Sequence, residues 1–242
     1  MPTLQVFDRI NTIETETTTG TSHELQSMPY EQYFGEMEFL TEEETEERIA
    51  LAKDLEDAMM FLLFMVVSQS RFDYMAAISS AEVKEAFRQR TIDAISKHTE
   101  IDADMLSQIN DFVDDVTDTT YEHLIILSRL MEEAQPDPEK VYAEEFYLSD
   151  DRARLLAEEE ANSAFEYKDY TDAIMLGYAT KTWVTMRDSA VRKTHRPMDD
   201  KTIPVDELFM VGDSFMRFPR DQKYNAKLKE IIRCRCGVVY NK

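Results

Sequence analysis

Trp183-Val-Thr-Met-Arg187-Asp188, Arg192-Lys-Thr-His195 and Cys234-Arg235-Cys236 all lie within the last sixty residues of a 242-residue chain. This stretch holds the only tryptophan and the only two cysteines of the protein. It also reverses the charge, because residues 179–242 contain 14 Lys and Arg against 8 Asp and Glu and carry +6. The whole chain carries −22, so residues 1–178 carry −28. The chain therefore divides into a long acidic part and a short basic part.

The composition is that of a globular and mainly helical protein. Hydrophobic residues make up 43% of the chain, and there are only 5 Gly and 7 Pro. So few turn residues favour long helices over a sheet of many strands. The length is enough for one large domain or two small ones. The acidic balance argues against nonspecific wrapping of nucleic acid by the whole molecule, since phosphate binding needs clustered cations.

Nothing in the sequence indicates secretion or a membrane. Residues 1–20 lack a basic start followed by an apolar stretch, as a signal peptide would have. The longest apolar run, Ala58–Val67, is shorter than the roughly 20 residues that cross a bilayer, and it is expected to form a buried helix. The Cys-x-Cys spacing would strain a disulfide, which indicates a reducing compartment or a metal role.

Capping residues and helical periodicity predict helices between residues 41 and 178. Thr41-Glu-Glu-Glu44 has the spacing of a capping box, and apolar residues recur at helical intervals after it. Further helix starts are expected at Ser80, Asp102, Asp137-Pro138 and Ser149. We therefore expect an acidic helical bundle over residues 41–136 and two more helices over residues 137–178.

The two ends of the chain differ from this helical region. Residues 1–40 are expected to form a mobile N-terminal arm with an aromatic anchor segment, Pro29–Leu40, which packs on a neighbour in this chain or in a partner. After Gly177 the period changes, and Thr180–Met186 and Ile231–Tyr240 are predicted strands. The predicted fold is thus mainly α, an N-terminal helical bundle followed by a small C-terminal α+β lobe over residues 179–242.

Three residues of the lobe are candidate metal ligands. His195, Cys234 and Cys236 are of the types that zinc accepts, and Asp188, Asp199 or water could supply a fourth ligand. In the alternative interpretation, His195 bonds a backbone carbonyl and the two cysteines face opposite sides of a strand, unless a turn or bulge interrupts it. The sequence leaves both open.

The basic lobe also offers candidate docking and catalytic groups. His195 beside Arg187 and Asp199 could act as a general base in a phosphodiester-cleaving cluster. A basic docking face for DNA phosphates or for an acidic protein surface would use Arg187, Arg192, Lys193 and Arg196. The remaining histidines have no evident partners and are expected at the surface or at an interface: His23, His98 and His123.

An ordered set of short motifs runs through about residues 140–242. Its members are Arg154-Leu-Leu-Ala-Glu-Glu-Glu160, Asn162, Gly177, Lys181-Thr-Trp183, Asp188, Val191-Arg192-x-x-His195, Met198-Asp199, Phe209, Pro219 and Cys234-Arg-Cys236. This set resembles the phage Mu F-like minor head proteins, and a domain of that type would cover residues 137–242. The family's acidic turn is usually Asp-Gly, where this chain has Asp199-Asp200. The residue before its Cys-Arg-Cys is often Asn, where this chain has Arg233.

The resemblance implies a minor structural protein of the virion (phage head or prohead), made in the bacterial cytoplasm and linked to head morphogenesis, DNA packaging or ejection. Implied partners are the portal, scaffold or major capsid protein, other copies in the particle, and phage DNA through the basic lobe. No enzymatic activity and no cofactor other than the zinc considered above is expected. The structural motif would consist of Trp183, Asp188, Arg192, His195, Asp199, Cys234, Arg235 and Cys236. The alternative is a phage-encoded effector or nuclease that uses the His/Arg/Asp cluster, with or without zinc.

Overall fold

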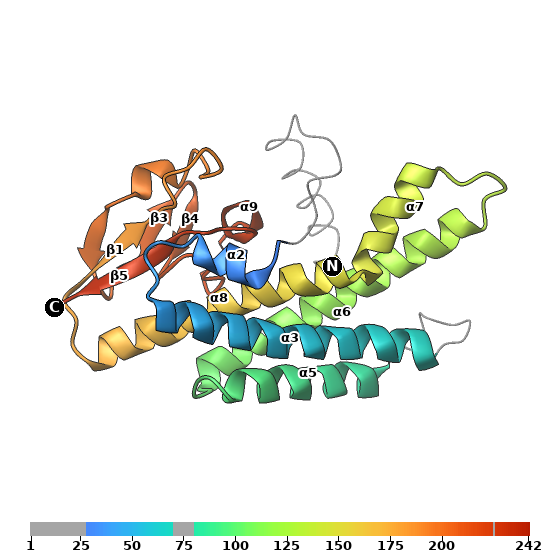
Figure 1. Ribbon diagram of the computed structural model, residues 1–242, viewed down its shortest axis with the longest axis horizontal. Coiled ribbons are helices and arrows are strands. Elements are labelled where there is room, and N and C mark those ends of the chain that lie inside the picture. The colour runs from blue at the N-terminus through green and yellow to red at the C-terminus, as the bar shows by residue number, and fades with distance from the viewer. Residues whose placement is uncertain (1–27, 70–79, 225) are drawn as a thin grey trace. The chain divides into compact units, whose positions relative to one another are not determined.

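The computed structural model describes residues 28–69, 80–224 and 226–242, so the predicted mobile arm lies largely outside the described residues (Figure 1). The prediction of a mainly α fold with a small α+β lobe is confirmed. The helices are α2 (Tyr30–Gly35), α3 (Glu42–Gln69), α5 (Ala81–Ser96), α6 (Ala103–Met131), α7 (Pro138–Glu145), α8 (Asp150–Met175) and α9 (Leu228–Ile231), with 3-10 turns η1 (Phe146–Leu148) and η2 (Arg196–Met198). The strands are β1 (Thr180–Val184), β2 (Thr202–Pro204), β3 (Phe209–Val211), β4 (Ser214–Met216) and β5 (Gly237–Asn241).

The predicted helix starts are confirmed, and most of them have the expected caps. At α3 the Thr41 N–H donates to Glu44 Oε2 over 2.7 Å and the Glu44 N–H donates to Thr41 Oγ1 over 3.2 Å, which is a complete capping box. The Asp102 carboxylate accepts from the N–H groups of Asp104 and Met105 at the start of α6. Each cap satisfies N–H groups that have no partner within the helix.

The chain divides into two compact units whose boundaries fall inside long helices. One, here the helical unit, comprises residues 50–160; the other, here the lobe unit, comprises residues 28–49 and 161–242 among the described residues. These boundaries differ from the predicted ones at 40 and 136. The difference arises because α3 and α8 are continuous helices whose two ends pack in different units.

The helical unit is built on apolar stripes with helical spacing. Buried residues of α3 in this unit are Leu51, Ala52, Leu55, Ala58, Met59, Leu62 and Val66, and those of α6 include Met105, Ile109, Val113, Val116 and Leu124. Polar ties accompany them, since Arg152 is buried and donates to Thr120 Oγ1 over 2.7 Å. Within the run Ala58–Val67, the buried face is made by Ala58, Met59, Leu62 and Val66, as expected of a buried helix, whereas Phe64 is exposed. Among the helices in the described ranges, none has the length and apolar composition that crossing a bilayer requires.

His123 corrects one expectation, because it is buried within the helical unit and not exposed. Its Nδ1 lies 2.6 Å from Glu144 Oε2, and its ring stacks on Tyr147. Burial, and then the charge of Arg152, lower the pKa of His123 to about 3. This histidine is therefore neutral over the ordinary pH range.

Five short strands build the lobe (Figure 1). β1 is the centre of an antiparallel sheet in the order β2-β1-β5, and β3 and β4 form a separate two-stranded pair. Trp183 on β1 pairs with Val238 on β5 and is fully buried. It packs in a core cluster with Met198, Phe209, Val211, Met216, Cys234 and Cys236.

The aromatic segment before α3 packs on the lobe within the same unit. Tyr30, Tyr33 and Phe34 are buried, and Asn162 Nδ2 on α8 donates to Tyr33 Oη over 3.3 Å. Phe39 contacts Gly237, at the start of β5, so closely that a Cβ there would lie 2.3 Å from the ring. Of the two predicted possibilities, packing within the chain is therefore the one the structure shows.

Candidate metal centre

Two segments of the lobe bring the three candidate ligands together. His195 ends the loop between β1 and η2, whereas Cys234 and Cys236 lie between α9 and β5. All three side chains are buried, with exposed fractions of 1%, 1% and 4%. Within the described residues they form the one group of at least three His, Cys, Asp or Glu side chains placed to hold a metal ion.

The ligand atoms face one another. His195 Nδ1 lies 3.5 Å from Cys234 Sγ and 3.5 Å from Cys236 Sγ, and the three ligand atoms are all within 4.8 Å of one another. The Trp183 ring meets the His195 ring edge to face at 5.6 Å between centroids. The two thiols and the imidazole nitrogen thus converge beside the buried indole.

The cysteines are not on a regular strand, so the predicted strand Ile231–Tyr240 requires correction. Leu228–Ile231 forms α9, and β5 begins only at Gly237. Between them Arg233 has a φ of 55°, and the Cys234 N–H donates to Ile231 O over 3.0 Å. This turn interrupts the alternation of side chains that would have placed the two thiols on opposite faces.

Arginine side chains fix the path of this turn. Arg192 donates to Ile232 O, and Arg220 donates to Cys234 O. Arg235, which separates the cysteines, bonds Glu36 over 3.0 Å and also bonds Asp188. Because Arg235 binds these two carboxylates, the residue between the two thiols is held outside the cluster.

A buried carboxylate orients the histidine. Glu230 Oε2 lies 3.2 Å from His195 Nε2 and accepts from Thr194 Oγ1 over 2.6 Å. A carboxylate accepts a hydrogen bond from the tautomer of His195 that carries its proton on Nε2, and in that tautomer the Nδ1 lone pair faces the sulfurs. Gly212 leaves room for this carboxylate, since a Cβ there would lie 3.0 Å from Glu230 Oε1.

The two thiols share their protons unequally. The hydrogen bond from Cys236 holds the pKa of Cys234 well below its ordinary value, with His195 and Arg220 acting in the same direction and burial opposing them. The same neighbour, together with burial, raises the pKa of Cys236. Cys234 is therefore the thiol that ionises first.

The predicted acidic fourth ligands have other partners. Asp199 accepts from the Thr185 N–H over 2.9 Å and from Arg187 Nε over 2.7 Å. Asp188 accepts from the N–H of Ala190 over 2.9 Å and also binds Arg235. Neither belongs to the His195 group, which leaves water from the predicted set.

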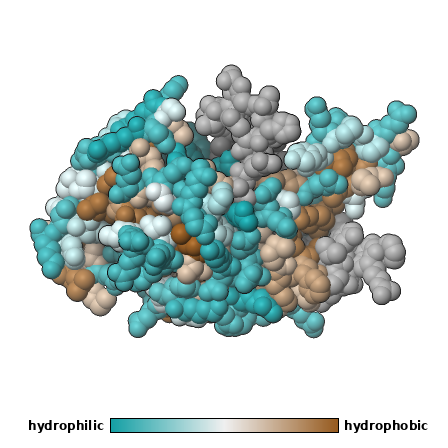
Figure 2. All heavy atoms as spheres, viewed as in Figure 1, coloured by the Kyte–Doolittle hydropathy of each residue, from teal (hydrophilic) through white to brown (hydrophobic). Residues whose placement is uncertain are grey.

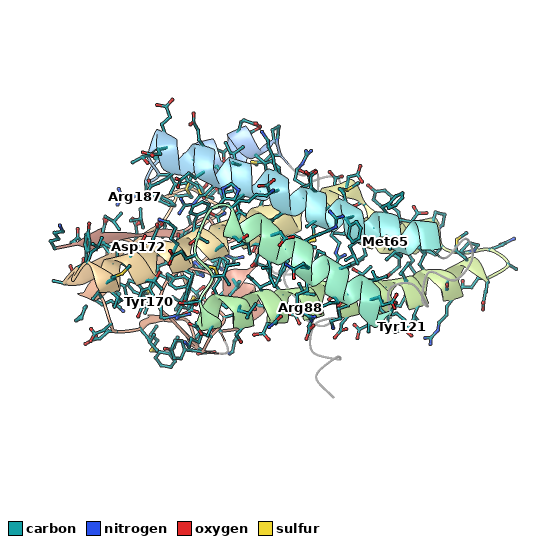
Figure 3. The ribbon with its side chains drawn as sticks, turned by 90° about the horizontal axis from the view of Figure 1, so that it is seen from below. Met65, Arg88, Tyr121, Tyr170, Asp172 and Arg187 are labelled. Atoms are coloured by element: carbon teal, nitrogen blue, oxygen red, sulfur yellow. The ribbon has the colours of Figure 1, made fainter. Side chains whose placement is uncertain are left out.

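These contacts also separate the predicted catalytic cluster. Both nitrogens of the buried His195 ring face Glu230 and the two thiols. Asp199 and Arg187 instead form an ion pair with each other, and Arg187 is exposed (Figure 3). Among the described residues, these contacts therefore provide no shared site in which His195 would act as a base beside Arg187 and Asp199.

The predicted basic docking residues are mostly engaged within the lobe. Arg187 pairs with Asp199 and with Asp200, and Arg196 donates to Val191 O over 3.0 Å and to Ser189 O. Arg192 is half-buried and binds Ile232 O. Lys193 is exposed, as are Arg187 and Arg196, but it takes part in none of these contacts. The arginines thus serve as internal ties.

One further cation of the motif set is buried. Lys181 on β1 is fully buried, and its Nζ lies 5.0 Å from the Tyr170 ring and 5.3 Å from the Phe209 ring. Burial lowers the pKa of Lys181 to about 8. Its Nζ forms no hydrogen bond within the described residues, so the aromatic faces are its near neighbours.

Sequence reasoning missed the residues that support the ligands. Glu230, Thr194 and Gly212 carry no spacing signal, because Glu230 is 35 residues from His195 along the chain. The functional interpretation depends on the chain's own residues, since no protein-family model, no curated protein and no solved structure matches this chain.

Proposed function

We propose that the chain is a minor head protein of a tailed phage or prophage, assembled into the prohead with the portal. Its acidic helices would contact the portal, scaffold or capsid protein, and its lobe would form a compact module in the particle. The proposal starts from the ordered motifs of residues 140–242, and it draws support from the backbone and the packing at those motifs.

The supporting observation with the most weight is the backbone at the two positions where this chain departs from the family pattern. Asp200 stands where the family usually has Gly and has a φ of 61°; Arg233 stands where the family often has Asn and has a φ of 55°. Gly adopts this left-handed region freely and Asn is enriched in it. In the described part of the chain, four non-glycine residues have a positive φ, and two of them are these.

The motif residues also have structural roles in the lobe. Trp183, Met198, Phe209, Cys234 and Cys236 belong to one buried cluster. The polar motif residues connect loops around that cluster, as described for Asp188, Arg192 and Arg235. A module of this kind serves assembly by holding a fixed shape, with no turnover required.

The helical unit offers apolar side chains for protein contact. The exposed fractions of Phe64, Met131 and Tyr142 are 66%, 64% and 69%. Figure 2 shows apolar residues among hydrophilic ones on the visible face. Large aromatic and methionine side chains surrounded by polar residues are typical of protein interfaces. We assign the contacts with the portal, scaffold or capsid protein to this unit.

The proposal includes contact between the lobe and phage DNA, which the exposed Lys193 and the lobe's net charge of +6 support. Such contact would be weak and salt-sensitive, because most arginines of the predicted face already bind carboxylates or carbonyls.

The test is sedimentation of native lysate from cells that produce the whole particle, with detection of this chain by antibody. Co-migration with prohead-sized particles is expected. It should be lost in cells that lack the portal protein but still form capsid shells, which serve as the matched control.

A chain found only in the slowly sedimenting fraction, while proheads form normally, would overturn the proposal. Cleavage of nucleic acid by the purified chain, abolished by His195→Ala but retained by the core variant Val211→Ala, would instead establish the nuclease alternative. Val211 is buried in the same cluster but carries no polar group, so it controls for loss of packing.

A further inference from the structure

We propose that His195, Cys234 and Cys236 bind one Zn²⁺ ion that stabilises the lobe. This inference goes beyond the proposed role in the phage head and rests on separate observations.

The distances from the histidine nitrogen to the two sulfurs fit a zinc tetrahedron. With Zn–S near 2.3 Å and Zn–N near 2.0–2.1 Å, tetrahedral angles place the nitrogen about 3.5–3.6 Å from each sulfur. The observed distances from His195 Nδ1 to Cys234 Sγ and to Cys236 Sγ are both 3.5 Å. An ion could therefore be accommodated with little movement of the chain.

The histidine is oriented as a ligand. Glu230 Oε2 lies 3.2 Å from His195 Nε2, so the tautomer with its proton on Nε2 donates to this carboxylate and directs the Nδ1 lone pair at the sulfurs. A carboxylate behind a ligating imidazole is the usual second partner of zinc-bound histidine, and it increases the basicity of the ring. Thr194 holds Glu230 in place over 2.6 Å. A histidine that only filled space in the core would not need this buried carboxylate.

The turn before β5 presents both thiols to the same point. It is held by hydrogen bonds to the carbonyls of Ile232 and Cys234, and Arg235 is bound to carboxylates outside the cluster. The objection that alternate residues of a strand face opposite sides does not apply to a left-handed turn at Arg233. The Cys234-x-Cys236 segment thus provides two thiol ligands to the same ion.

The chemistry of the donors selects the metal. Two thiolates and an imidazole suit zinc, whereas Mg²⁺ and Ca²⁺ prefer oxygen ligands. On binding, the thiol protons of Cys234 and Cys236 leave to solvent, and the neutral His195 donates its Nδ1 lone pair. The two thiolates balance the charge of the ion, and the fourth position is left for water.

Burial and connectivity point to a structural role. The ligands are at most 4% exposed, and the strands around them are only three to five residues long. The ion would link His195 to cysteines 39 and 41 residues further along the chain. In a small module with a limited apolar core, such a link contributes directly to the free energy of folding.

The test uses the full-length chain, produced in zinc-supplied cells and purified without chelators or a polyhistidine tag. Elemental analysis should give one zinc per chain. Cys234→Ser, Cys236→Ser and His195→Gln should each lose the metal. Val211→Ala, a change at a buried residue of the same cluster that is no ligand, should be less stable yet retain its zinc.

Two further readouts start from the wild-type chain, and the first needs no variant. Replacement of zinc by Co²⁺ in the wild-type chain should give the strong visible absorption of tetrahedral cobalt and a thiolate-to-cobalt charge-transfer band. Removal of the ion by a chelator should lower the unfolding midpoint of the wild type and leave that of Cys236→Ser unchanged.

A folded wild-type chain without zinc and without a cobalt spectrum would overturn the proposal, and the cluster would then be a hydrogen-bonded thiol–imidazole core. Zinc retained in both cysteine variants would place the metal elsewhere and would also refute it. Neither result would affect the head assignment, which depends on sedimentation with the prohead.

Discussion

Gly237→Ala tests whether the aromatic segment before α3 belongs to the lobe. A Cβ at Gly237 would lie 2.3, 2.7 and 2.9 Å from three carbons of the Phe39 ring. All three distances are shorter than van der Waals contact, so the ring or the β5 backbone must move. Overpacking of this kind costs about 1–3 kcal/mol. Gly237 does not have a positive φ, so backbone strain adds nothing to this cost.

The assay is urea unfolding followed by the fluorescence of Trp183, the only tryptophan, which is fully buried in the lobe. With an m-value of about 1–3 kcal/mol per molar urea, the midpoint should fall by about 1 M. Gly35→Ala is the matched control, because a Cβ on Gly35, the last residue of α2, meets nothing within 4 Å. Its midpoint should stay the same or rise slightly.

A double-mutant cycle completes the test. Phe39→Ala removes the ring with which the new Cβ of Gly237→Ala would clash. In the Phe39→Ala background, Gly237→Ala should therefore lower the free energy of unfolding by less than about 0.5 kcal/mol. Equal midpoints for Gly237→Ala and Gly35→Ala would refute the packing of residues 28–40 on the lobe. A full cost of Gly237→Ala without the Phe39 ring would do the same.

Three other substitutions have defined outcomes. Asp221→Asn removes the buried carboxylate that pairs with the buried Arg217 at 2.8 Å, so it should lower the free energy of unfolding by about 3–5 kcal/mol. Tryptophan fluorescence during urea unfolding measures this, and a decrease below about 1 kcal/mol would contradict it. Asp200→Gly should raise the free energy of unfolding by up to about 1 kcal/mol, because glycine adopts the φ of 61° without strain. The ion pair with Arg187 that it removes is exposed and contributes little. A lower urea midpoint would argue against backbone strain at this position. Burial, followed by the charge of Arg152, lowers the pKa of His123 to about 3 in the folded chain, whereas the unfolded value is about 6.5. The contribution of neutral His123 to the free energy of unfolding is therefore complete above pH 6.5 and is lost as the pH falls towards 3. By pH 5 the free energy of unfolding should have fallen by about 2 kcal/mol, measured by circular dichroism. His123→Gln has no group that titrates at this position and should not show this decrease.

The helix starts could be predicted because the signals are local. Thr41 and Asp102 cap their helices with their own side chains, over two or three residues. The strand at Trp183 was also predicted, since β-branched and aromatic residues favour a pleated and half-buried surface. Such features need no information from distant parts of the chain.

The errors concern contacts between distant residues. Ile231 and its neighbours have the composition of a strand, but the chain forms a helical turn and then a left-handed residue at Arg233, held by arginines from other loops. Glu230 likewise becomes the partner of His195 only in the folded lobe. His123 was misplaced because no spacing signal predicts that it stacks on Tyr147.

The lobe unit is discontinuous, which constrains when it can form during synthesis. Residues 28–49 leave the ribosome first, but the remainder of the unit begins at 161, 112 residues later. At 5–20 residues per second this gap corresponds to roughly 6–22 s. The helical unit, which is continuous, has the opportunity to fold during this interval.

A fragment beginning at residue 137 would lack Phe34 and Phe39, and its apolar surface would be left uncovered. Expression of the lobe in isolation therefore requires the two segments to be joined or co-produced.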